Sequence, residues 1–216
     1  MSYDEDLLYI EDANNRKLYY RFTPAPFFSN FAPLLVVLHD EGKAEANHFE
    51  YKMWNILTPL DNFEYANNGT CWLGEEDDFF VKDLLQKLIK QFAEKLECED
   101  HIYLYGNSMG GYGAILHGIL CKANAVYAES PCIILQEKHD TISKEYDLSH
   151  FLNLIDSFPI FYLCSHDNHL EDEIVYFVET CKKFDIKVHP DFCPKSGDDE
   201  NHTLKKVLDM FEHVTS

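Results

Sequence analysis

Short apolar runs alternate with segments of helical spacing along most of the chain. Several runs are apolar on successive residues, which is typical of strands buried on both faces of a sheet. The pattern predicts strands at 7–10, 17–22, 33–39, 101–106, 125–129, 159–165 and 186–192. The first two form an antiparallel opening pair. The alternation of strand and helix after them predicts parallel βαβ units and an α/β fold.

The helical segments predict what covers this sheet. Between residues 80 and 96, apolar positions recur at helical spacing, and Lys82 lies with three further lysines on the opposite, solvated face. Other helices are predicted from Tyr112, over 171–184 and from Leu204. The result is a three-layer α/β/α sandwich with a mostly parallel sheet, in one domain spanning residues 1–216. Two weakly patterned stretches, 64–74 and 132–158, are candidates to overhang a site.

Composition and charge exclude several classes of partner. The chain is 46% hydrophobic and carries a formal net charge of −20, so nucleic acid and anionic membranes are poor partners. No apolar run reaches the ~20 residues of a membrane span, and the first 15 residues lack the features of a secretion signal. Seven cysteines without a C-x-x-C pair favour reduced thiols and a cytoplasmic location.

Four of the nine glycines lie within one stretch, GNSMGGYG at 106–113. The pattern G-x-S-x-G directly follows a predicted strand and precedes a helical pattern, which predicts a nucleophile elbow around Ser108. Gly106 and Gly110 would avoid clashes in the sharp turn, and the amide of Met109 would donate to an oxyanion. A phosphate loop or a plain tight turn is the alternative; against the phosphate loop, no lysine follows as in G-K-S/T, and G-x-G-x-x-G is absent.

A serine nucleophile needs a histidine base and an acid that orients the base. In the expected chain order, the acid follows the second strand beyond the elbow and the histidine follows the last strand. Asp167 occupies the acid position; Glu171 or Asp172 replaces it if the loop is longer, and a helix N-cap is the non-catalytic alternative. His202 lies in the predicted loop before the last helix, which favours it among the eleven histidines.

The second oxyanion donor is expected from the turn HDEG that follows the strand at 33–39. The backbone amide of Asp40 or Glu41 is the candidate. Because an acidic side chain would repel the developing negative charge, we expect both carboxylates to turn outward.

Together these motifs resemble the α/β-hydrolase superfamily from Leu34 to Val214. More narrowly, GNSMGGYGAILHGILCKANAVYAESP is similar to a bacterial branch associated with surface polysaccharides, which includes capsule O-acetyltransferases and accessory Sec glycan proteins. The resemblance implies an α/β-hydrolase fold, a triad of Ser108, Asp167 and His202, and an oxyanion donor at Met109. The polar composition of 132–158 predicts a minimal lid and not an apolar one of the lipase kind. The sequence HDEG departs from the common His-Gly oxyanion turn of the superfamily.

The expected function is a serine carboxylesterase that cleaves a small acyl ester through an acyl-enzyme, without a cofactor or metal. The substrate would be a small-molecule or glycan ester. Transfer of the acyl group to a surface glycan, as by an O-acyltransferase, is an alternative, and a peptidase or thioesterase would use the same triad. A non-catalytic binding protein with this fold is the alternative from another class; the presence of all three triad residue types argues against it. The sequence leaves the oligomeric state open.

Overall fold

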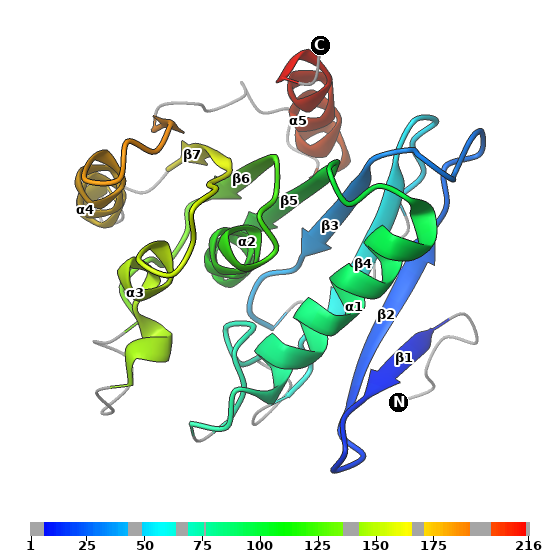
Figure 1. Cartoon of the computed structure of the whole chain (residues 1–216), viewed down its shortest axis with the longest axis horizontal. Coiled ribbons are helices and arrows are strands. Elements are labelled where there is room, and N and C mark those ends of the chain that lie inside the picture. The colour runs from blue at the N-terminus through cyan, green and yellow to red at the C-terminus, as the bar shows by residue number, and fades with distance from the viewer. Residues whose placement is uncertain are drawn as a thin grey trace.

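The structure, a computed structural model, describes residues 7–42, 49–63, 69–75, 77–135, 143–165 and 171–190, the backbone of 200–214 and the side chains of 203–213. Within these ranges, eight strands form one sheet in the order β1-β2-β4-β3-β5-β6-β7-β8 (Figure 1). β1 and β2 pair antiparallel, as do β2 and β4, and the other neighbours are parallel. The strands are β1 (Leu8–Glu11), β2 (Lys17–Thr23), β3 (Leu34–Leu38), β4 (Asn55–Leu60), β5 (Ile102–Asn107), β6 (Ala125–Glu129), β7 (Ile160–Cys164) and β8 (Val188–His189). This arrangement confirms the predicted α/β class and the antiparallel opening pair.

The sequence prediction missed β4, which lies between β2 and β3. Its sequence NILTPL contains Pro59, and a proline inside a run argues against a central strand. In the structure β3 pairs with β4 only as far as Leu57, whereas β2 pairs with β4 as far as Leu60. At Pro59, β4 therefore has a neighbouring strand on one side only. Proline is tolerated at such an edge-like position, although it has no N–H to donate.

Helices cover both faces of the sheet (Figure 1). One face packs against α1 (Phe80–Leu96), α2 (Met109–Leu120), the short 3₁₀ turn η2 (Lys144–Tyr146) with α3 (Leu148–Leu152), and α4 (Glu171–Lys182). The other face packs against α5 (Glu200–Val214). The three-layer α/β/α arrangement predicted from the sequence is confirmed.

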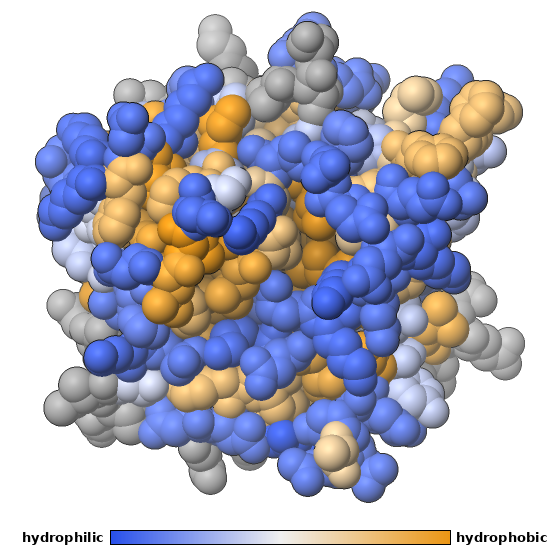
Figure 2. Space-filling view, in the orientation of Figure 1, coloured by the Kyte–Doolittle hydropathy of each residue, from blue (hydrophilic) through white to orange (hydrophobic). Residues whose placement is uncertain are grey.

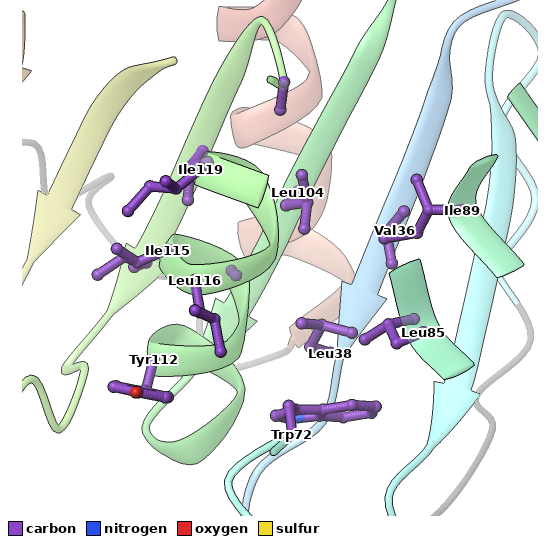
Figure 3. Packing of buried hydrophobic residues seen from close by; sticks show 14 of the residues in the cluster. Val36, Leu38, Trp72, Leu85, Ile89, Leu104, Tyr112, Ile115, Leu116 and Ile119 are labelled. Atoms are coloured by element: carbon purple, nitrogen blue, oxygen red, sulfur yellow. The ribbon is translucent and has the colours of Figure 1, made fainter. Parts of the chain in front are cut away.

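The larger core lies under α1 and α2. Leu85 and Ile89 of α1 approach Val36 and Leu38 of β3 (Figure 3). Trp72, which is fully buried, lies below Leu38 near the first turns of α2 (Figure 3). The core therefore supports the carboxyl ends of β3 and β5, where the elbow is predicted.

Two sequence expectations need correction. Lys82 does not belong to a solvated face: its side chain is only 15% exposed and pairs with Glu145 of η2, because η2 packs over the start of α1. Cys164, at the end of β7, is disulfide-bonded, so the thiols are not all reduced as expected. The five other described cysteines carry free thiols.

The stretch 132–158 is only partly an overhanging segment. Its described residues include η2 and α3, and Leu135, Tyr146 and Phe151 are buried in the larger core. This part of the stretch is therefore a packed layer of the fold. Residues 136–142 lie outside the described ranges.

Candidate active site

Ser108 joins β5 to α2 with a strained backbone. Its φ is 51° and its ψ is −113°, a region that non-glycine residues rarely occupy, at a cost of order 1–3 kcal/mol. Two hydrogen bonds hold the turn: the Ser108 N–H donates to the carbonyl of Glu129 at 2.8 Å, and the Tyr112 N–H donates to the Ser108 carbonyl at 3.1 Å. This geometry is that of a nucleophile elbow, with the serine at the tip of a strand-to-helix turn.

Neighbouring backbone makes glycine necessary on both sides of Ser108. A Cβ at Gly106 would lie 2.0 Å from the carbonyl oxygen of Gly110. A Cβ at Gly110 would lie 2.2 Å from the carbonyl oxygen of Leu38. Because both obstructions are backbone atoms, they cannot turn aside. The close approach of Gly110 to Leu38 also brings the end of β3 against the elbow.

The first turn of α2 places amides next to the serine. Met109 is the first residue of the helix, and the N-terminus of a helix favours negative charge. The Met109 side chain is buried, and a Cβ at Gly69 would lie only 2.7 Å from its terminal methyl group. The position of the Met109 amide is therefore fixed by both its helix and its side chain.

The turn after β3 offers one backbone amide more readily than the other. The Glu41 N–H donates to Oδ1 of Asp40 at 2.7 Å, so that amide already has a partner. The Asp40 amide is the better candidate for the second oxyanion donor. Glu41 is exposed, in agreement with an outward side chain, whereas the Asp40 carboxylate folds back onto the turn.

His39 holds the carbonyl side of this turn. Its Nε2 accepts from the Asp61 N–H at 2.9 Å, so the proton of the neutral ring is on Nδ1, which donates to the carbonyl of Asp40 at 2.8 Å. Burial lowers the pKa of His39 from its ordinary value, which favours this neutral form. The ring also packs on Trp72, with centroids 4.9 Å apart.

Asp61 extends this network towards the elbow. Its side chain is fully buried, and Oδ2 accepts from the N–H groups of Thr70 at 2.7 Å and Trp72 at 2.8 Å. A Cβ at Gly113 of α2 would lie 2.4 Å from the Trp72 ring, so this loop packs directly on the elbow helix. The sequence prediction missed His39 and Asp61, because their contacts join segments far apart in the chain.

Glu129 is a further carboxylate that the sequence prediction did not consider. It is the last residue of β6 and is in register with Asn107, the last residue of β5. Ala128 belongs to the core under α2 and Tyr127 to the core under α5, so alternation along the strand places Glu129 on the α5 face. The sequence did contain a signal for Glu129, because it is an acidic residue at the end of β6, the strand that pairs with β5.

The described residues do not bring the whole predicted triad together. Asp167 lies outside the described ranges. The alternatives Glu171 and Asp172 form the first turn of α4 and are exposed. His202 was predicted in a loop, but α5 begins at Glu200, where an acidic residue suits the helix dipole; His202 is thus in the first turn, with its side chain outside the description.

Neither a metal site nor a membrane span is found in the described part of the chain. Across 7–42, 49–63, 69–75, 77–135, 143–165, 171–190 and 203–213, no group of three or more His, Cys, Asp or Glu side chains could hold a metal ion. No helix in the described part of the chain is long and apolar enough to cross a bilayer.

Comparison with known proteins identifies the fold. No protein-family model matches the sequence, and a search of the curated proteins finds no match. Among solved structures, the chain is similar to the capsule O-acetyltransferase of Neisseria meningitidis serogroup A, with a TM-score of 0.69 and 15% identity over 100% of this chain and 97% of that one. It is also similar to Thermogutta terrifontis esterase 2, modified by tabun, with a TM-score of 0.66 and 15% identity over 97% and 93%.

A third similar structure is much longer than this chain. Porphyromonas gingivalis dipeptidyl peptidase 4 matches with a TM-score of 0.67 and 13% identity, over 97% of this chain but only 35% of the peptidase. At these identities the likeness establishes the fold. The chain has the α/β-hydrolase fold, with Ser108 at the elbow between β5 and α2.

Proposed function

We propose that the protein is a serine esterase that cleaves a small acyl ester through an acyl-enzyme on Ser108. The observation that carries the proposal is the strained backbone of Ser108 beside the N-terminus of α2. Strain of this kind costs stability and clusters at functional sites, and here it falls on the serine of the G-x-S-x-G motif. The similar structures include an esterase and an O-acetyltransferase, which supports acyl transfer as the reaction class.

In the proposed mechanism, His202 removes the proton of Ser108 Oγ as Oγ attacks the ester carbonyl carbon. The carbonyl oxygen becomes an oxyanion that accepts from the amides of Met109 and Asp40. When the tetrahedral intermediate collapses, the ester C–O bond breaks and His202 gives its proton to the leaving alcohol. Asp167 keeps the imidazole in the required tautomer and stabilises its charged form.

The acyl-enzyme is then released by a second hydroxyl compound. His202 removes a proton from water or from a sugar hydroxyl, which attacks the acyl carbon, and the proton returns to Ser108 Oγ. Water as acceptor gives an esterase, and a sugar hydroxyl gives an O-acyltransferase. The similarity to a capsule O-acetyltransferase over nearly the full length of both chains keeps the second outcome as the alternative.

We propose an acetyl-sized acyl group. Among the apolar residues in the described part of 132–158, Leu154 alone is exposed, so this part offers little apolar surface to shelter a long acyl chain. A series of nitrophenyl esters from acetate to octanoate tests the preference. We expect acetate to be the best substrate; a preference for octanoate would contradict the small-acyl proposal.

The nucleophile is tested by substitution. Ser108→Ala should lower kcat by ~10⁴-fold or more, as removal of a triad nucleophile does. Ser130→Ala is the control, since Ser130 also follows a strand and has a positive φ of 42°. We expect it to keep at least about a tenth of the activity, because it has no attacking role. Full activity in the Ser108 variant would overturn the proposal.

A further inference from the structure

A cavity of about 240 Å³ lies between α3 and α4, beside the segment that follows β6. Its wall includes Ile133 from that segment, Asp147 and Ser149 at the start of α3, and Tyr176 and Thr180 from α4. On the face seen in Figure 2, apolar side chains gather around α3 within a rim of hydrophilic ones. None of these residues has a part in the proposed chemistry at Ser108.

Two carboxylates fix the walls of this cavity. Oε2 of Glu173 in α4 accepts from the backbone N–H groups of Ile133 at 2.6 Å and Ile134 at 2.9 Å, which ties the segment after β6 to α4. Asp147 caps α3 and accepts from the N–H of Ser149 at 2.9 Å and from its hydroxyl at 2.7 Å. The cavity is therefore formed before any ligand arrives, which lowers the cost of binding.

A third contact anchors the same wall from the other side. Lys82 of α1 pairs with Glu145, and the Tyr146 hydroxyl, from the next residue of η2, donates to Oδ1 of Asp77 at 3.3 Å. Since Tyr146 lines the cavity, η2 cannot move without breaking these contacts.

The lining selects the chemistry of the ligand. None of the described residues that line the cavity is Lys or Arg, and the carboxylate of Asp147 would repel an anion. Ser149 gives its hydroxyl proton to Asp147, but its oxygen and the remaining lone pairs of Asp147 can still accept from the hydroxyl groups of a neutral ligand, and Thr180 adds a second hydroxyl. Tyr176 and Ile133 offer apolar surface. A sugar ring, with hydroxyls at its edge and C–H groups on its faces, combines both properties.

The size of the cavity suggests how much of a glycan enters. Pockets for drug-sized ligands are typically ~300–1,000 Å³, so a cavity of about 240 Å³ suits one sugar ring. Tyr176 is 49% exposed, which places part of its ring at the rim. The rest of a bound glycan would continue past Tyr176 into solvent.

The cavity is linked to the elbow through a short segment. The backbone N–H of Ser108 donates to the carbonyl of Glu129, and a Cβ at Gly111 would lie 3.1 Å from Cβ of Pro131. Ile133 of the cavity wall is only two residues beyond Pro131, at most ~7 Å along an extended chain. A sugar held in the cavity is thus near enough for a neighbouring unit of the same glycan to approach the nucleophile.

We propose that the cavity between α3 and α4 binds one neutral sugar unit of the acylated glycan on which Ser108 acts. This inference rests on the proposed esterase or acyltransferase function and names its substrate class. The cavity is a positioning subsite, and its residues do not touch the reacting atoms.

Direct binding tests the subsite without any turnover. Ser108→Ala protein is titrated by saturation-transfer NMR with a panel of neutral oligosaccharides built from hexose, N-acetylhexosamine or pentose units, and with an oligogalacturonate. We expect at least one neutral oligosaccharide to bind, and the anionic one to bind more weakly. Adding Tyr176→Ala should weaken the affinity about tenfold, because it removes the aromatic wall. Binding by none of the neutral sugars, or undiminished binding without the Tyr176 ring, would overturn the subsite.

Kinetics with the otherwise unsubstituted protein give an independent test. Tyr176→Ala should raise KM for the acetylated form of the bound oligosaccharide about tenfold, with kcat/KM for nitrophenyl acetate falling less than about threefold. Tyr9→Ala is the matched control: Tyr9 is also 49% exposed but lies on β1, and it should change neither value. Equal losses on both esters would show a general structural effect and contradict the subsite.

The two tests separate failure of the subsite from failure of the proposed function. If neither ester is turned over but a sugar binds in a manner that depends on Tyr176, the proposed reaction is wrong and the sugar site stands. If nitrophenyl acetate is turned over through Ser108 but no sugar binds, the reaction stands and the subsite is wrong.

Discussion

The two ends of the sheet both hold non-glycine residues at positive φ, but different contacts hold them there. At the carboxyl end, Ser108 is held by backbone hydrogen bonds and by close backbone contacts that require glycine. At the amino end, the loop between β2 and β3 contains Phe28 at φ 54° and Phe31 at φ 74°. In that loop the Phe31 N–H donates to the carbonyl of Leu96 at 2.8 Å, and the fully buried side chain of Asn55 in β4 makes three further hydrogen bonds.

This difference assigns separate tasks to the two ends. The Asn55 side chain accepts from the Ala25 N–H at 3.0 Å and donates to the carbonyls of Ser29 at 2.8 Å and Ala32 at 2.9 Å. These bonds complete a long connection and contribute stability. The strain at Ser108 instead lies directly after the end of β5, which is in register with the end of β6. Substitutions at the two ends should therefore separate activity from stability.

After the loss of Ser108 itself, the largest effect is expected from the proposed acid of the triad, which follows β7 in the sequence. Asp167→Asn should keep the fold and lower kcat ~10³–10⁴-fold, because asparagine does not favour the tautomer that accepts the serine proton. Steady-state kinetics beside Glu171→Gln, Asp172→Asn and Glu129→Gln provide the controls. A greater loss in any of these three than in Asp167→Asn would move the acid to that position.

Gly110→Ala should lower both activity and stability, since the added Cβ would lie 2.2 Å from the Leu38 carbonyl oxygen. We expect a loss of ~10²-fold or more in kcat/KM from displacement of the Met109 amide, and about 2–3 kcal/mol in the free energy of unfolding. Gly42→Ala is the stability control: Gly42 has φ 68° but open space around it, so the cost should be about 1 kcal/mol. Equal urea midpoints for the two variants would show that the close approach is unimportant.

Asn55→Ala should loosen the loop between β2 and β3 and lower stability without lowering kcat. It leaves two buried backbone groups and the part-buried Ser29 carbonyl without their partner, so the free energy of unfolding should fall by about 2–4 kcal/mol in urea titrations. The kcat per folded molecule should stay within about twofold of the parent, because Asn55 is level with the start of β5, whereas Ser108 follows the end of that strand. A kcat loss comparable to that of Gly110→Ala would contradict the separation of tasks.

The pH dependence of stability tests a third region, the buried His117 of α2, the helix that follows Ser108. Burial lowers the pKa of His117 in α2 from 6.5 to about 4, and its ring bonds the Trp72 carbonyl at 3.0 Å and the Gln86 side chain at 2.8 Å. As the pH falls, His117 therefore binds a proton in the unfolded chain at a higher pH than in the folded chain. Stability is fully present above pH 6.5 and is lost as the pH falls towards about 4, by up to about 3 kcal/mol.

The measurement is a urea titration at several pH values, with His117→Gln as the comparison. The carboxylates titrate in both proteins, so the difference between the two curves isolates the histidine. We expect the advantage of the parent protein to shrink as the pH falls from 6.5 to 4. A constant difference would show that His117 does not titrate on unfolding.

The sequence could predict those parts of the fold and site that depend on local pattern. Continuous apolar runs predict the buried strands. The glycines at 106 and 110 predict the elbow, and close backbone contacts require them there. β4 was missed because Pro59 argues against a strand unless its single-sided pairing is known. α5 starts at Glu200 and not at Leu204 because its first four residues are all polar and so carry no apolar periodicity.

The supporting contacts of the site depend on residues far apart in the chain. The bond between the Asp61 N–H and His39 spans 22 positions, and the contact between Trp72 and Gly113 spans 41. Neither has a local signature, because burial and strand order bring the partners together. The same holds for Asn55, whose three partners lie between Ala25 and Ala32.

The most direct test of the account is covalent labelling of the folded protein with a fluorophosphonate. The reagent reacts with a serine only where a base and an oxyanion site activate it. We expect one adduct per chain by intact mass, located by peptide sequencing at Ser108, and none in Ser108→Ala protein. Labelling at Ser130 or another serine, or no labelling of the folded protein, would contradict the assignment of Ser108 as the nucleophile.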